Sequence, residues 1–164
     1  MERNSKQTLR VKNVCNMLLC FLLLWLAGCK GKEEPVPFEG NVPPPQWTLT
    51  NNYDMSSSMT VIVKVDLALT YKTQVKSTGW QIAENDLLAA FDGENCIGIA
   101  QADNDLFFLY VTPPLNGTEV KLAYYSAQLK NLFYAQQTIT FRNDDIIGTV
   151  SDPVTPQWTV TDDK

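Results

Sequence analysis

The catalytic side chains open to this chain are limited, because its 164 residues include four cysteines and no histidine. Without histidine, a serine or cysteine nucleophile lacks the imidazole base that usually activates it. Two carboxylates can hydrolyse a glycosidic bond, and Asp86, Asp92 and Glu94 lie close together in the sequence. Such residues at strand ends and hairpin tips are more typical of turns. We therefore expect a protein that is not an enzyme, with a glycan-active enzyme as the least favoured alternative.

Acidic loops are the remaining candidates for metal binding. Asp92, Asp103 and Asp105 belong to short clusters of oxygen ligands of the kind that Ca²⁺ prefers, but none of the clusters has the EF-hand spacing. Solvated turns on an acidic domain explain the same clusters more simply. We expect no metal and no cofactor, and keep these three aspartates as weak calcium candidates.

Aromatic side chains that are not obviously directed into a core are the candidates for ligand binding. Trp80 follows a glycine in a polar stretch, Tyr125 lies on the polar face of an alternating segment, and Tyr134 ends a short apolar run. Flat rings with a polar group suit sugar faces and protein interfaces. These three residues predict a site for a glycan or protein ligand, although core packing is the simpler role for any one of them.

Alternating and continuous apolar runs indicate β-strands in the first half of the domain. Residues 59–71 alternate between apolar and mostly polar side chains, which predicts one long half-buried strand. Residues 87–91 and 96–100 flank the sequence Asp-Gly-Glu-Asn, a pattern typical of a β-hairpin. The continuous apolar run 106–111 predicts a central strand that is buried on both faces.

The second half of the domain continues in the same way. Residues 119–125 alternate again, residues 132–134 and 138–141 predict a second hairpin, and residues 146–150 predict a last short strand. We find no convincing stripe with the 3.6-residue period of a helix. The fold expected is all-β: an antiparallel β-sandwich of seven to eight short strands, immunoglobulin-like or jelly-roll.

The first 28 residues have the features of a secretory signal. A basic stretch precedes the uncharged apolar residues 17–26, which are fewer than the ~20 that a membrane span needs. The run ends in Leu26-Ala27-Gly28-Cys29, which resembles the lipobox of bacterial lipoproteins. The resemblance implies cleavage before Cys29 and lipidation of that cysteine. Acyl chains would then hold the protein to the membrane.

Removal of this signal changes both the charge and the cysteine content. The first 28 residues hold four of the 13 Lys and Arg and one of the 18 Asp and Glu, so the mature chain has a net charge of −8. That charge argues against a nucleic-acid partner. Cys15 and Cys20 leave with the signal, so Cys96 remains as a small apolar side chain. Lys30 follows the lipidated cysteine, which by resemblance favours the outer membrane, and Lys32-Glu33-Glu34 loosely resembles the acidic stretch that sends some lipoproteins to the cell surface.

The mature chain divides into a tether, a domain and a tail. We assign residues 1–28 to the signal, the Pro- and Glu-rich residues 29–45 to an extended tether, 46–155 to the sandwich and 156–164 to the tail. The sequence Pro-Gln-Trp-Thr-Leu-Thr, which begins at Pro45, recurs in the tail with one change of Leu to Val. The two copies are either equivalent edge strands or the openings of two successive repeat modules.

The domain also resembles a module of secreted and surface proteins from Gram-negative gut and oral anaerobes. Its centre, Ala-Phe-Asp-Gly-Glu-Asn-Cys-Ile-Gly at residues 90–98, follows the module's Ala-Phe-x-Gly-x-x-Cys-x-Gly pattern, with Ile97 where that pattern usually has Arg. The resemblance implies exposure at the cell surface and a part in adhesion or binding. We therefore expect a lipid-anchored, non-catalytic binding or adhesion module of the cell envelope. The alternative is a structural or accessory subunit of an envelope assembly.

Overall fold

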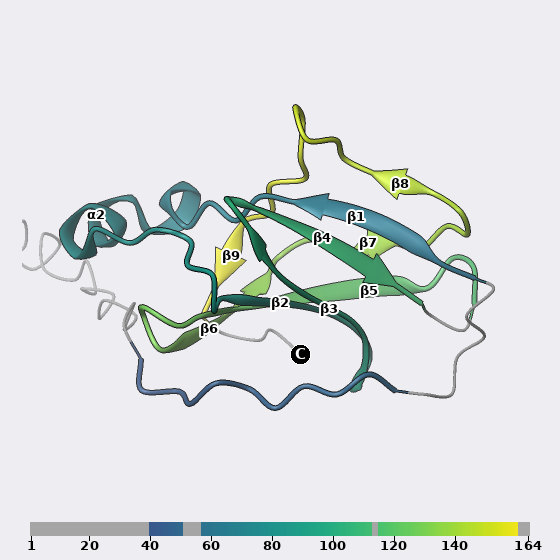
Figure 1. Ribbon diagram of the computed structural model, residues 1–164, viewed down its shortest axis with the longest axis horizontal. Helices are drawn as coiled ribbons and strands as arrows, with labels where there is room; N and C mark the ends of the chain where they lie inside the picture. The colour runs from purple at the N-terminus through teal and green to yellow at the C-terminus, as the bar shows by residue number, and fades with distance from the viewer. Residues whose placement is uncertain (1–39, 51–56, 113–114, 161–164) are drawn as a thin grey trace, which may run out of the picture. The chain divides into compact units, whose positions relative to one another are not determined.

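The computed structural model describes residues 40–50, 57–112 and 115–160. Strands are the main secondary structure of the described chain, and one helix lies to the side of them (Figure 1). The elements are, in chain order, β1 (Met59–Val63), α2 (Ala68–Thr78), β2 (Leu87–Asp92), β3 (Asn95–Asp103), β4 (Leu106–Val111), β5 (Glu119–Ser126), β6 (Asn131–Ala135), β7 (Ile139–Thr140), β8 (Ile146–Ile147) and β9 (Trp158–Thr159). Of these residues, no helix is long and apolar enough to cross a bilayer.

The strands form one curled sheet in the order β8-β1-β4-β3-β2-β5-β6-β9, with β7 also paired to β5. Every strand pair is antiparallel except β1–β8. The prediction of a β-rich, mainly antiparallel fold is therefore confirmed. The sheet is a half-barrel that does not divide clearly into two facing layers, so neither an immunoglobulin-like nor a jelly-roll sandwich is established.

The curl of the sheet is concentrated at β3. This strand pairs with β2 through Gln101 and only then with β4, at Ala102 and Asp103. Gly98 allows the two backbones to approach, because a Cβ at this position would lie 2.5 Å from the carbonyl oxygen of Tyr110. A register shift between Ala90 and Phe91 adds a bulge to β2, and bulges bend and twist strands locally.

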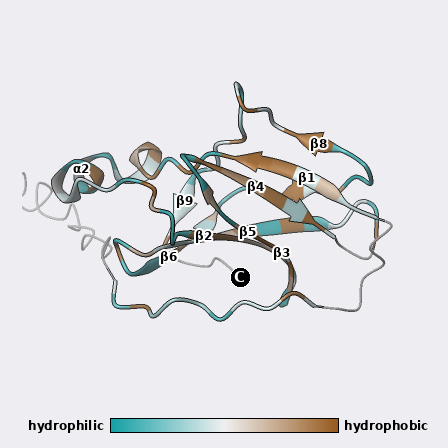
Figure 2. Cartoon of the chain, in the orientation of Figure 1, coloured by the Kyte–Doolittle hydropathy of each residue, from teal (hydrophilic) through white to brown (hydrophobic). Residues whose placement is uncertain are grey.

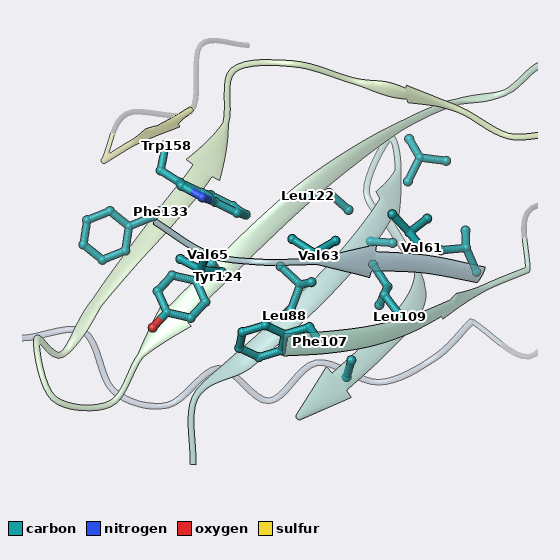
Figure 3. Packing of buried hydrophobic residues seen from close by; sticks show 14 of the residues in the cluster. Val61, Val63, Val65, Leu88, Phe107, Leu109, Leu122, Tyr124, Phe133 and Trp158 are labelled. Carbon is teal, nitrogen blue, oxygen red and sulfur yellow. The ribbon is translucent and has the colours of Figure 1, made fainter. Parts of the chain in front are cut away.

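The inner face of the half-barrel holds the hydrophobic core (Figure 3). Side chains from several strands meet there, including Val61, Leu88, Phe107, Tyr124 and Phe133, all fully buried. Figure 2 shows that hydrophobic residues are concentrated in strands such as β1, β2 and β3. Burial of this apolar surface is the main force that stabilises the fold.

The long strand predicted over residues 59–71 is wrong beyond Val63. The alternation holds in β1, but the chain then enters α2. Leu67 and Tyr71 are buried while Leu69 is 55% exposed, and Val75 packs partly against the core. These buried positions are four residues apart, which is the spacing of one helix face. Leu67, Leu69 and Tyr71 also fit a period of two, so the strand signal concealed a short helical stripe.

The second predicted hairpin is also different in the structure. β6 and β7 do not pair with each other, because each pairs with a different part of β5. The predicted strand at residues 146–150 shortens to β8, which lies parallel to β1. The hairpin of β2 and β3 around Gly93 forms as predicted, with Gly93 at φ +60°.

The run 106–111 forms an interior strand of the sheet, but it is not buried on both faces. β4 lies between β1 and β3. Phe107 and Leu109 point into the core, whereas Phe108 and Tyr110 on the outer face are 44% and 50% exposed. Aromatic content made this strand appear continuously apolar, although its burial alternates with a period of two.

Residues 40–50 cover part of the outer face of the sheet, running past β6, β2 and β3 (Figure 1). Backbone N–H groups of Gly40 and Val42 donate to the carbonyls of Leu129 and Lys130, at 3.0 and 2.8 Å. At the other end, Thr50 N–H donates to the carbonyl of Cys96 at 2.9 Å. Residues 40–45, which we assigned to the tether, thus lie against the domain.

The C-terminal copy of the repeated hexapeptide lies in the core. Trp158 on β9 is fully buried and packs against Tyr124, with ring centroids 5.8 Å apart. β9 pairs with the end of β6, where Trp158 lies opposite Ala135. Residues 156–160 therefore pack as part of this domain. Whether they also open a repeat module stays a prediction.

Candidate functional site

A pocket of about 260 Å³ opens on the outer face of β2, β5 and β6. Strand pairing explains why its lining residues meet. Phe91 on β2 lies opposite Lys121 on β5, and Ala123 on β5 lies opposite Tyr134 on β6. The lining residues are Trp47, Phe91, Gly93, Glu94, Lys121, Leu122, Ala123, Leu132 and Tyr134.

Trp47 reaches the pocket from residues 40–50, which are far from these strands in sequence. Its indole ring packs edge-to-face on Phe91, with ring centroids 5.8 Å apart and ring planes at 75°. Such T-shaped pairs are favourable beyond their buried area, by ~0.5–1.5 kcal/mol. Both rings are half-buried. Trp47 is therefore fixed in place while part of its surface stays open to a ligand.

The charged residues at the pocket are one acid and one base. Glu94 lies in the turn between β2 and β3, Lys121 lies on β5, and both are exposed. The pocket thus combines three aromatic rings with one carboxylate acceptor and one ammonium donor. This composition, apolar walls with a few polar groups, is typical of sites for small ligands.

Of the three aromatic residues predicted to bind a ligand, only Tyr134 lines this pocket. Trp80 is half-buried, packs edge-to-face on Tyr124, and donates its indole N–H to the Ser126 hydroxyl at 3.1 Å. Tyr125 is 2% exposed and donates its hydroxyl to the carbonyl of Val42 at 3.2 Å. Trp80 and Tyr125 therefore have packing partners in the domain.

Sequence reasoning did not select Trp47 and Phe91 as ligand-binding residues. Phe91 belongs to the quoted Ala-Phe-x-Gly pattern, and Trp47 belongs to the repeated hexapeptide. A repeated tryptophan is a signal that could have found one of them. Nothing local in the sequence shows that residues 40–50 lie across β2, because that contact joins segments about 40 residues apart.

Of the three weak calcium candidates, Asp92 lies apart from Asp103 and Asp105, which share the turn between β3 and β4. Asp92 ends β2 beside the pocket turn, while Asp103 ends β3 and Asp105 precedes β4 at the far end of that strand. Asp105 forms an ion pair with Lys64, whose Nζ lies 2.8 Å from the carboxylate. The hydrogen bond and the attraction between the two charges lower the pKa of Asp105 and raise the pKa of Lys64. In the described part of the chain, no three His, Cys, Asp or Glu residues cluster closely enough to hold a metal.

Asp86, considered above for carboxylate chemistry, is fully buried and holds two loops together. Its carboxylate accepts hydrogen bonds from the N–H groups of Ala83 and Ala127, at 3.0 and 2.8 Å, and from the Tyr124 hydroxyl at 2.5 Å. Burial, followed by the Asp86 charge, strongly raises the pKa of Tyr124. These contacts give Asp86 a structural role.

Cys96 is buried, with 6% of its surface exposed. Its thiol lies 3.6 Å from the carbonyl of Gly98, and burial raises its pKa. A raised pKa keeps the sulfur as the less reactive thiol. The position agrees with the small apolar role expected for this cysteine.

Comparison of the chain with protein families, with curated proteins and with solved structures finds no match.

Proposed function

We propose that this chain is a lipid-anchored, non-catalytic binding protein of the bacterial cell envelope, with its ligand site in the aromatic pocket. The observation that carries the proposal is the meeting of Trp47, Phe91 and Tyr134, from three separate segments, around one open pocket. Core packing does not account for it, because the core lies on the opposite face of the sheet. Half-exposed aromatic rings beside polar groups are characteristic of recognition sites.

The anchor in this proposal comes from the sequence. Leu26-Ala27-Gly28-Cys29 resembles a lipobox, and two or three acyl chains give stable attachment at ~0.8 kcal/mol per buried methylene. The domain would lie outside the cytoplasm, at the outer membrane or on the cell surface. A binding domain on a lipid anchor suits adhesion, since many weak contacts on one surface act together.

A structural or accessory role is the second candidate, and the exposed side of β4 favours it. Phe108 and Tyr110 present two aromatic rings to solvent on one face of an interior strand. Exposed aromatic residues of this kind mark protein interfaces. This role predicts a protein partner that contacts β4 and makes no use of the pocket.

Retention of bacteria on immobilised host matrix tests the proposed function. Cells that produce the wild-type protein should be retained, while cells with Trp47→Ala should be lost in the wash. Phe108→Ala is the matched control, because it removes an exposed ring from the other part of the outer face. Retention lost only with Phe108→Ala would favour the structural role, and equal retention of all strains, including one without the protein, would refute adhesion.

A further inference from the structure

The dimensions of the pocket limit what it can hold. At about 260 Å³ it falls below the ~300–1,000 Å³ typical of sites for drug-sized ligands. One six-membered ring with its substituents is the scale of ligand that such a space accepts. A longer ligand would place one of its units in the pocket and extend out through the open side. It would be recognised mainly through that one unit.

The chemistry of the lining restricts the ligand further. Trp47 and Tyr134 offer flat carbon surfaces, and Tyr134 also carries a hydroxyl. Glu94 and Lys121 supply an acceptor and a donor at the same pocket. A pyranose ring has an apolar C–H face and a rim of hydroxyls that both donate and accept, so it satisfies both halves of this lining.

The balance of charge at the pocket favours a neutral ligand. The whole chain has a net charge of −5, yet the pocket has one carboxylate and one ammonium. An acidic sugar would be repelled by the Glu94 carboxylate and by the net negative charge of the chain. A cationic sugar would be repelled by the Lys121 ammonium. A ligand without charge avoids both penalties.

From this fit we infer that the pocket binds one neutral pyranose unit of a glycan. The C–H face of the sugar rests on the aromatic rings, and its hydroxyls bond to the Glu94 carboxylate and the Lys121 ammonium. The inference rests on the proposed function and names its ligand class. A proline-rich peptide, which also docks on aromatic residues, is the other outcome that the test distinguishes.

Titration of the complete lipoprotein in detergent micelles tests the inference. The probes are neutral methyl pyranosides and their short oligomers, a sialylated oligosaccharide and a polyproline peptide, with binding followed by saturation-transfer NMR. At least one neutral pyranoside should bind saturably. The affinity for a neutral sugar should change little with salt concentration. Salt screens interactions between charges, and an uncharged ligand makes no such interaction with the pocket.

Variants locate the bound sugar. Trp47→Ala should weaken binding about tenfold, the factor that corresponds to ~1.4 kcal/mol, whereas Trp47→Phe should retain part of it because a flat ring remains. Lys121→Met and Glu94→Gln should each weaken binding, with the glutamine variant affected less because its amide still accepts a hydrogen bond. Phe108→Ala is the control and should bind as the wild type does. Circular dichroism shows whether each variant is folded.

Three results would overturn the inference. They are binding of the peptide but of no pyranoside, preference for the sialylated probe, and equal sugar binding by Trp47→Ala and wild type. The first two leave the proposed binding function standing, provided that cell retention still requires Trp47. If neither sugar nor peptide binds and retention is independent of Trp47, the proposed function fails as well.

Discussion

At the scale of single residues, Asp86 shows how a residue that suggests chemistry can serve structure. Its buried carboxylate accepts hydrogen bonds from two partly buried backbone N–H groups and from the buried Tyr124 hydroxyl. Buried polar groups that lose their partners cost ~1–3 kcal/mol each.

Asp86→Ala should destabilise the domain by about 3–5 kcal/mol, because it leaves the buried Tyr124 hydroxyl and two partly buried backbone N–H groups without an acceptor. Asp86→Asn should cost less, about 2 kcal/mol, because its amide oxygen still accepts while its NH₂ opposes one donor. Urea unfolding followed by tryptophan fluorescence measures both changes. Equal stability of Asp86→Ala and wild type would show that the buried contacts are not formed.

Tyr124 predicts how stability depends on alkaline pH. Its pKa in the folded protein is raised far above the ordinary value of about 10, so the folded state keeps a proton that the unfolded state loses. This contribution to stability is fully present below about pH 10 and is lost as the pH rises further. Tyr124→Phe should flatten the loss above pH 10 in urea unfolding at several pH values. An unchanged slope would contradict the burial of this hydroxyl.

At the scale of elements, the repeated hexapeptide separates what sequence can predict from what it cannot. Trp47 and Trp158 have nearly identical neighbours, yet one is half-buried over the outer face and the other is fully buried in the core. The two local sequences differ only by Leu49 against Val160, so the difference in burial comes from what each segment packs against. Strands such as β5 were predictable because alternation is local, whereas the position of residues 40–50 depends on long-range contacts.

The same pair of residues gives a matched test of packing. Trp158→Ala should cost about 3–5 kcal/mol, as expected for removal of a large core side chain. Trp47→Ala should cost less than about 2 kcal/mol, because only part of its ring is removed from water. Chemical unfolding of the two variants provides the comparison. Similar costs would mean that the two hexapeptides are equivalently packed, against the structure.

Helix α2 shows a second limit of sequence reasoning. Its stripe of Leu67, Tyr71 and Val75 spans little more than two turns, and the backbone of Tyr71 leaves helical geometry (φ −113°, ψ 40°). A helical pattern this short and interrupted is weaker than the alternating pattern that starts in β1. The sequence therefore favoured a strand where the structure has a helix. The true boundary follows Asp66, whose carboxylate accepts a hydrogen bond from the N–H of Ala68 at 2.9 Å, a contact that favours the start of a helix.

At the scale of the whole molecule, the outer face of the sheet has two parts with different properties. Residues 40–50 run past β6, β2 and β3 and contribute Trp47 to the pocket, whereas the face of β4 stays open at Phe108 and Tyr110. Apolar alternation predicted the core-facing residues of β1 and β5, such as Val61 and Leu122. It could not predict the single half-barrel or the pocket, because both depend on how distant segments meet.

Attachment to the membrane has its own test. Cys29→Ala should leave an uncleaved precursor and remove the acylated anchor, since the thiol is the site of lipidation in the lipobox that this sequence resembles. Metabolic labelling with a radioactive fatty acid, together with the mobility of the product on a gel, measures both effects. A Cys29→Ala protein that is processed and labelled normally would show that the lipobox interpretation is wrong. Cys96→Ala is the control and should be labelled like the wild type.

The central claim is that a ligand binds at the aromatic pocket, and one binding screen tests it most directly. The detergent-solubilised lipoprotein and its Trp47→Ala variant are applied side by side to a glycan array that also carries host-matrix proteins. Our account predicts saturable binding by the wild type and clearly weaker binding by the folded variant. Equal binding by both proteins, or no binding by a folded wild type, would contradict it.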